Sequence, residues 1–114
     1  MKFERFEDII VWQKALDLSV LIYNVFEDTK DYGFKDQIQR AGVSIMNNIA
    51  EGFERKSNNE FRQFLYISKG SSGEVLSMAI LAKKLRKINN EDADKLYSQS
   101  EEISKMLSGL IKTL

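Results

Sequence analysis

The stretch Arg40-Ala41-Gly42-Val43-Ser44-Ile45-Met46-Asn47-Asn48-Ile49-Ala50-Glu51-Gly52 decides the fold that this chain is predicted to adopt. At helical spacing, its small, apolar and amide side chains fall along one side, so a second helix can approach closely and still meet polar groups. Polar side chains recur along it at spacings of 4, 4 and 3 residues: Arg40, Ser44, Asn48 and Glu51. We predict that they form a hydrogen-bonded ladder that fixes a helix interface, either within one bundle or between subunits.

The rest of the chain is typical of four helices joined by short turns. Proline is absent and there are only six glycines, which favours long uninterrupted helices. Apolar periodicity predicts helices over about 7–28, 34–55 and 58–88, with a fourth helix after a turn at about 88–91. We therefore predict an all-α fold, an up-down-up-down antiparallel four-helix bundle made of a single domain, residues 1–114.

The first predicted helix carries two apolar stripes, more than one packing face requires. One stripe consists of Ile9, Trp12, Leu16, Tyr23 and Phe26, and the other of Val11, Ala15, Leu18, Ile22 and Val25. A central helix in a monomeric bundle would account for both stripes. We favour a helix that serves the core on one side and a subunit interface on the other, which predicts a homo-oligomer.

The middle of the third predicted helix, Ser68 to Gly73, consists almost entirely of small residues. A phosphate-binding glycine loop would need the P-loop spacing and a preceding strand, and this segment has neither. We expect instead a close helix crossing, in which Gly70 and Gly73 face the small side of the second helix.

Histidine and cysteine are both absent, which restricts the chemistry open to the chain. No disulfide or thiolate nucleophile is possible, and the Glu-x-x-His motif of di-metal helical bundles cannot form. We predict no enzymatic activity, no cofactor and no metal site. Glu51 and Glu74 are the carboxylates expected inside the bundle, where each would pair with Arg40 or cap a buried amide.

The net charge is zero, with 17 basic and 17 acidic residues, but the middle half is basic. Two groups of basic residues stand out: Arg55, Lys56, Arg62 and Lys69, and then Lys83, Lys84, Arg86 and Lys87. One interpretation is a solvated surface that complements the helix dipoles. The other is a nucleic-acid surface, repeated around a symmetric ring, to which Tyr66 or Tyr97 could add base stacking.

The chain has no apolar signal core near Met1 and no apolar run near the ~20 residues of a membrane span. A cytoplasmic location without a membrane partner is therefore the expectation.

Three stretches in the right order resemble the small bacterial four-helix bundle protein family, also called 23S rRNA intervening-sequence proteins. Gln37 to Ala41, Val43-Ser44 and Asn48 to Gly52 look like the family hallmark. Val11 to Ala15 resembles its first-helix motif, and Lys69 to Glu74 resembles its glycine-serine step followed by glutamate. The likeness extends over nearly the whole chain.

The sequence also departs from the family pattern at three places. Ile45-Met46 stands where relatives often have an apolar residue followed by proline, Gly73 replaces a bulkier residue, and the loop before the second predicted helix lacks the proline frequent in relatives. These departures bear on local helix geometry and leave the resemblance intact.

The resemblance implies a ring-shaped homopentamer, because the family is similar to pentameric accessory proteins of diversity-generating retroelements, which bind a reverse transcriptase and nucleic acid. Some family members are encoded within insertions in the rRNA gene. We therefore expect a non-enzymatic, oligomeric, RNA-associated protein. The alternative is a protein–protein scaffold or an accessory subunit for a nucleic-acid enzyme such as a reverse transcriptase.

Overall fold

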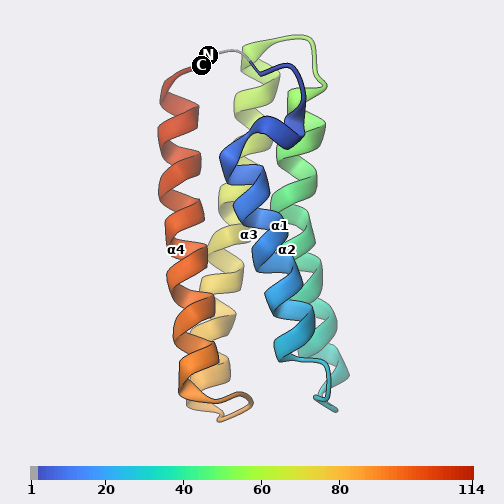
Figure 1. The fold of residues 1–114 in the computed structure, drawn as a ribbon, viewed down its shortest axis with the longest axis vertical. Helices are drawn as coiled ribbons and strands as arrows, with labels where there is room; N and C mark the ends of the chain where they lie inside the picture. Colours follow the sequence, from blue (N-terminus) through green and yellow to red (C-terminus); the bar gives the residue numbers. More distant parts are fainter. Residues whose placement is uncertain (1–2) are drawn as a thin grey trace.

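The computed structural model describes residues 3–114, which form four long helices side by side (Figure 1). A short 3-10 helix, η1 (Phe6–Asp8), precedes the four helices, which are α1 (Ile10–Val25), α2 (Tyr32–Phe53), α3 (Asn58–Lys84) and α4 (Asn90–Lys112). The bundle measures 43 × 21 × 19 Å along its principal axes. Residues 3–114 contain no strand, so the predicted all-α architecture of four helices is confirmed for this part of the chain.

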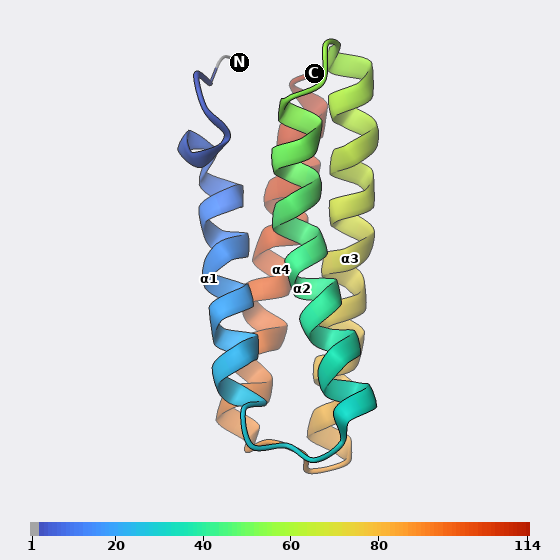
Figure 2. The same cartoon turned by 90° about the vertical axis from the view of Figure 1, so that its right-hand side faces the viewer.

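Consecutive helices pack against one another, and α1 also packs against α4. The pairs α1 and α3, and α2 and α4, lie diagonally across the bundle, with no Cα atoms within 8 Å of each other (Figure 2). The start of the described chain and its C-terminus lie at the same end of the molecule (Figure 1).

The helix boundaries differ from the predicted ones mainly where the chain turns without glycine or proline. α3 ends at Lys84 and not near 88, because Arg86 adopts a left-handed conformation with φ 56°. The N–H of Lys87 then bonds back to the carbonyl oxygen of Ala82 at 3.0 Å, a helix-ending arrangement that usually uses glycine. α1 is also shorter than predicted, since Glu7 and Asp8 belong to η1.

Three of the four long helices begin with a side-chain cap. The side chains of Asp31, Ser57 and Asn89 accept hydrogen bonds from the backbone N–H groups of Phe34, Glu60 and Asp92 respectively. Each cap satisfies one of the N–H groups that a helix start leaves without a partner.

The two apolar stripes of α1 have different environments. Val11, Ala15, Leu18 and Ile22 of the second stripe are buried in the core. The first stripe divides, because Ile9 and Phe26 at its ends are buried while Leu16 and Tyr23 in its middle are exposed. An apolar row therefore remains on the outside of α1, and the interface predicted for it stays a prediction.

Two glycines of α2 allow the neighbouring helices to approach closely. A Cβ atom built on Gly52 would lie 2.6 Å from the Cβ atom of Phe64 in α3, and one on Gly42 would lie 2.7 Å from Cδ1 of Ile22 in α1. The Cβ atom of Phe64 is fixed by its backbone, so only glycine fits at position 52 at this spacing of α2 and α3. At Gly42 the close atom is the movable end of the Ile22 side chain, and the next atoms of α1 lie 3.6 Å and 3.9 Å away.

The prediction that Gly70 and Gly73 face α2 was wrong. Both residues are exposed, and a Cβ atom on either would meet no heavy atom within 4 Å. The buried small residues of α3 are Ser68 and Ser72, whose hydroxyls donate to the carbonyl oxygens of Ile45 at 2.9 Å and of Ser100 at 2.7 Å. Gly70 lies two residues from each serine, about 200° around the helix, and so points outward.

An ion pair ties the α1–α2 turn to the α3–α4 turn. Nζ of Lys87 lies 2.6 Å from Oδ2 of Asp31 and 5.3 Å from the centre of the Phe34 ring. Oδ1 of Asp31 also accepts the Phe34 N–H at 3.2 Å. The hydrogen bond from Lys87, followed by that from Phe34, lowers the pKa of the Asp31 carboxyl.

We predict that Asp31→Asn lowers the melting temperature at pH 7, because asparagine keeps a cap acceptor but loses the charge that pairs with Lys87. Since the folded-state pKa of Asp31 is depressed, its stabilising effect is present above the usual pKa of about 4 and is lost as the pH falls through the folded-state pKa. The difference in melting temperature between wild type and variant should therefore shrink on acidification. Circular dichroism melts at several pH values measure it.

Asp17→Asn is the matched control, because Asp17 is exposed on α1 and forms no ion pair within residues 3–114. Its melting temperature should follow that of the wild type. A deficit of Asp31→Asn that is equally large at low pH would contradict an origin in the carboxylate charge.

We also predict that Gly52→Ala destabilises the bundle by about 1–3 kcal/mol, since the added methyl group forces α2 and α3 apart. The control Gly109→Ala lies in α4, where an added Cβ meets nothing within 4 Å, and should stabilise the helix by up to about 1 kcal/mol. Urea unfolding of both variants gives the two signs. Equal effects of the two substitutions would show that close packing at Gly52 is not limiting.

Candidate nucleic-acid interface

The predicted polar ladder of α2 forms only in its middle. Nδ2 of Asn48 donates to the carbonyl oxygen of Ser44 at 2.8 Å and to its Oγ at 3.0 Å. Oγ of Ser71 in α3 donates to the same Ser44 Oγ at 2.9 Å. The polar contacts of Ser44 thus join α2 to α3 within one chain.

Arg40 and Glu51, at the two ends of the predicted ladder, instead form ion pairs with neighbours on α2 and just after it. Nε of Arg40 pairs with Oδ2 of Asp36 at 2.8 Å, and Oε1 of Glu51 pairs with Nη2 of Arg55 at 2.9 Å. Both ion pairs join residues four apart on the exposed side of α2, which offers each charge a partner without burial.

The placement of Glu51 and Glu74 inside the bundle was wrong, since both are exposed. Oε2 of Glu74 accepts a hydrogen bond from Nε2 of Gln37 at 3.2 Å, and neither carboxylate pairs with Arg40. Within residues 3–114, no group of three or more metal-ligating side chains lies close enough to hold an ion.

The two basic groups are separated along α3. The first runs from the turn before the helix to Lys69 near its middle, and the second begins at Lys83 near its end, so a stretch of 14 residues, about 21 Å of helix, lies between them. Several of the cations are already occupied: Arg55 by Glu51, Lys83 by Asp94, Lys87 by Asp31, and Arg62 by the carbonyl oxygen of Leu114. Within residues 3–114, the remaining members form no ion pair: Lys56, Lys69, Lys84 and Arg86.

The first half of α3 bears a shallow groove lined by an aromatic ring, a guanidinium and two amides. It has a volume of about 430 Å³ and is lined by Asn59, Arg62, Gln63, Tyr66 and Ile67. Tyr66 is 55% exposed, so its ring can stack on a base. Oδ1 of Asn59 accepts from Nη1 of Arg62 at 2.7 Å, which fixes the guanidinium beside the ring.

The sequence interpretation named Arg62 and Tyr66 but missed the two amides, Asn59 and Gln63. These four side chains recur at spacings of 3, 1 and 3 residues along α3, so their common side follows from helical spacing. Amide groups can hydrogen-bond base edges. Two of the five N–H groups of the Arg62 guanidinium bond Asn59 and Leu114, which leaves donors that can bind phosphate.

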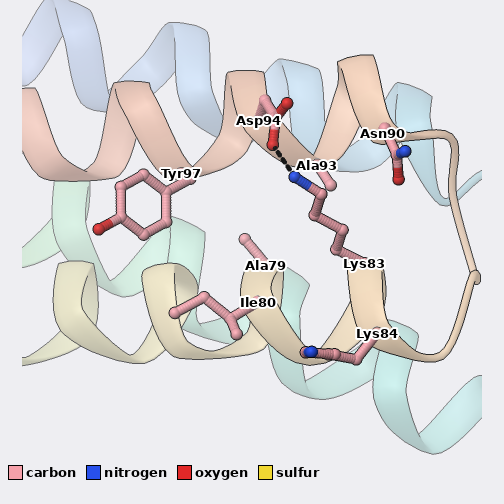
Figure 3. A pocket seen from close by; sticks show the side chains of 8 residues that line it. All are labelled: Ala79, Ile80, Lys83, Lys84, Asn90, Ala93, Asp94 and Tyr97. Atoms are coloured by element: carbon pink, nitrogen blue, oxygen red, sulfur yellow. Dashed lines mark hydrogen bonds and ion pairs between the residues drawn. The ribbon is translucent and has the colours of Figure 1, made fainter.

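A second groove lies between α3 and α4, where the other basic group is found (Figure 3). Its volume is about 510 Å³, and its lining includes Ala79, Ile80, Ala93 and Tyr97. Nζ of Lys83 reaches Oδ1 of Asp94 across the groove at 2.7 Å, while Lys84 is directed away from that carboxylate (Figure 3). With Lys83 neutralised, this groove suits an apolar side chain better than a phosphate backbone.

No helix in residues 3–114 is both long and apolar enough to cross a lipid bilayer.

Comparisons with known proteins place this geometry in a family. The sequence model of the 23S rRNA-intervening sequence protein family matches residues 7–109. A crystal structure of a protein of unknown function from the S23 ribosomal protein family of Bacteroides thetaiotaomicron is similar, with a TM-score of 0.84 and 29% sequence identity. The alignment covers 90% of this chain and 98% of that chain. A search of the curated proteins finds no match. The chain belongs to the family of 23S rRNA-intervening sequence proteins.

Proposed function

We propose that this protein is a non-enzymatic, homo-oligomeric bundle that binds single-stranded RNA through the first half of α3. The observation that carries the proposal is the groove at Arg62 and Tyr66, where an exposed ring, a fixed guanidinium and two amides lie together. Lys56 and Lys69 extend this surface with cations that form no ion pair within residues 3–114. The family's link to the 23S rRNA gene supports RNA as the ligand.

The proposal includes the helix order and the assembly. We take the helices as up-down-up-down, supported by the packing of consecutive helices and by the two ends of the described chain at one end of the molecule. The apolar row left outside α1 supports association of copies, and the family resemblance suggests a pentameric ring. Such a ring, placed in the cytoplasm, would multiply a weak contact per copy into useful avidity.

The absence of histidine and cysteine supports a binding role over a catalytic one. General acid–base work near neutral pH would then need a carboxyl, lysine or tyrosine with a strongly shifted pKa in an enclosed pocket. The pKa of the Asp31 carboxyl is lowered, which makes it a weaker base, and this residue caps α2 at the end of the bundle.

The test is fluorescence anisotropy with labelled RNA and DNA at two salt concentrations. Lys56→Gln with Lys69→Gln should weaken RNA binding roughly tenfold at low salt and make its salt dependence shallower, by roughly 0.7–0.9 in slope for each lost phosphate contact. Tyr66→Ala should weaken binding at both salt concentrations, because stacking does not depend on counterions.

The matched control replaces two exposed cations of α4, Lys95→Gln with Lys112→Gln, and changes the net charge equally. It should leave the affinity for RNA near that of the wild type. An equal loss in both double variants would reduce the contact to non-specific charge, and no binding by the wild type at low salt would end the nucleic-acid proposal.

A protein scaffold is the second candidate, and the α3–α4 groove favours it. Its lining is apolar apart from the Lys83–Asp94 pair and the rim at Lys84 and Asn90. An acidic partner with one apolar anchor, such as a subunit of a nucleic-acid enzyme, would fit there. This candidate predicts that Ile80→Asp abolishes partner binding and leaves RNA binding unchanged in the same anisotropy experiment.

A further inference from the structure

A third groove lies on α1 and α2, apart from the proposed RNA surface of α3. Its volume is about 560 Å³, and the polar residues Arg40, Ser44 and Asn48 of α2 form part of its lining. Tyr23 of α1 and Val43 of α2 also line it, and the Tyr23 side chain is 49% exposed. The groove thus combines one accessible aromatic ring with a row of polar groups that the proposed RNA surface does not use.

The amides in this groove keep most of their hydrogen-bonding capacity. Within residues 3–114, the side chains of Gln39 and Asn47 form no hydrogen bond, so each offers two N–H donors and a carbonyl acceptor. Nδ2 of Asn48 donates to Ser44, and its Oδ1 is left to accept from a ligand. The groove therefore offers amide donors and amide acceptors side by side.

The hydroxyl of Ser44 is left with its own proton to donate. Its Oγ accepts from Nδ2 of Asn48 at 3.0 Å and from Oγ of Ser71 at 2.9 Å. A hydroxyl oxygen has two acceptor lone pairs, so both are occupied and the O–H group remains as a donor. Because Ser44 lines the groove and is half-buried, a ligand oxygen in the groove can accept that proton.

The charges that line the groove cancel. They belong to Arg40 and Asp36, whose Nε and Oδ2 atoms lie 2.8 Å apart. The paired guanidinium keeps further N–H donors and Oδ1 of Asp36 can still accept, so the pair offers both kinds of hydrogen bond at zero net charge. An anion gains little here, because Asp36 offsets the attraction of Arg40, whereas the groove of α3 joins the cation Arg62 to uncharged residues.

An uncharged ligand rich in hydroxyl groups matches these features. A sugar hydroxyl donates one hydrogen bond and accepts up to two, which suits amides, a serine O–H group and an arginine–aspartate pair. The C–H face of a sugar ring is weakly apolar and can pack on the exposed ring of Tyr23. We propose that the groove between α1 and α2 binds an uncharged carbohydrate, with one sugar ring on Tyr23 and hydroxyl groups bound along α2 from Asp36 to Asn48.

The length of the polar row favours a disaccharide or a longer chain. Asp36 and Asn48 are 12 residues apart, which corresponds to about 18 Å of helix. A peptide is less suitable, because Val43 is the aliphatic member of the lining and offers little apolar surface for an anchoring side chain.

The test is saturation-transfer difference NMR on the full chain with maltose, cellobiose, lactose and N,N′-diacetylchitobiose. At least one disaccharide should receive saturation, most strongly on the protons of one ring face. Glucose 6-phosphate tests for recognition of charge, and acetyl-triglycine amide tests for recognition of a peptide backbone. Each of these two probes should bind about tenfold more weakly than the best disaccharide.

Variants locate the site. Tyr23→Ala should weaken binding of the best disaccharide about tenfold, and Tyr23→Phe should retain most of the affinity, because the ring supplies the packing. Gln39→Ala with Asn47→Ala should weaken it by a similar factor. The matched control replaces two amides outside the groove, Asn24→Ala with Gln99→Ala, and should bind like the wild type. Circular dichroism and light scattering check that fold and mass are unchanged.

The opposite results are equally clear. A wild type that binds none of the four disaccharides would overturn the proposal, as would either comparison probe binding as tightly as the best of them. Equal losses in the amide variant and its control would show that the sugar is not held in this groove. A loss of RNA affinity in Tyr23→Ala would assign the groove to nucleic acid and not to carbohydrate.

Discussion

The close approach of α2 to α3 is the constraint on which the rest of the structure depends. Gly52 lets α3 come so near that the Cβ atom of Phe64 leaves no room for a methyl group. The same approach brings Ser71 to Ser44 and the hydroxyl of Ser68 to the carbonyl oxygen of Ile45. Steric fit and hydrogen bonding thus fix the register of α3 on α2 together.

Once that register is set, the outward face of α3 follows from helical geometry. With Ser68 and Ser72 directed inward, Gly70 and Gly73 must face solvent. Gly70 and Gly73 therefore lie at exposed helical positions, as Gly33 and Gly109 also do, where glycine inside a helix costs about 1 kcal/mol relative to alanine.

The fold class could be predicted from the sequence because apolar periodicity and the hallmark around Asn48 agree on four helices. The end of α3 could not be predicted, since Arg86 adopts a left-handed conformation that is usually occupied by glycine. The buried side of α3 was misassigned because serine and glycine are both small enough for a close helix crossing. Serine is the one that is buried here, because its hydroxyl can donate to a helix carbonyl oxygen.

The candidate site was only partly predictable for a related reason. Glu51 was placed inside because Asn48 and Gly52 lie beside it in the sequence, yet Arg55 four residues later offers a solvated partner. Lys87 was predicted to be a free basic surface residue, but its ammonium group binds the carboxylate of Asp31, 56 positions away in the sequence. Such long-range pairs are decided by tertiary structure and leave no local sequence pattern.

The direction of the exposed apolar row on α1 has a consequence for whatever covers it. Tyr23 lines a groove together with Val43 and Asn47 of α2, so the row is directed partly toward α2. A side chain seated beside Tyr23 would therefore meet the polar and apolar groups of α2 as well as those of α1.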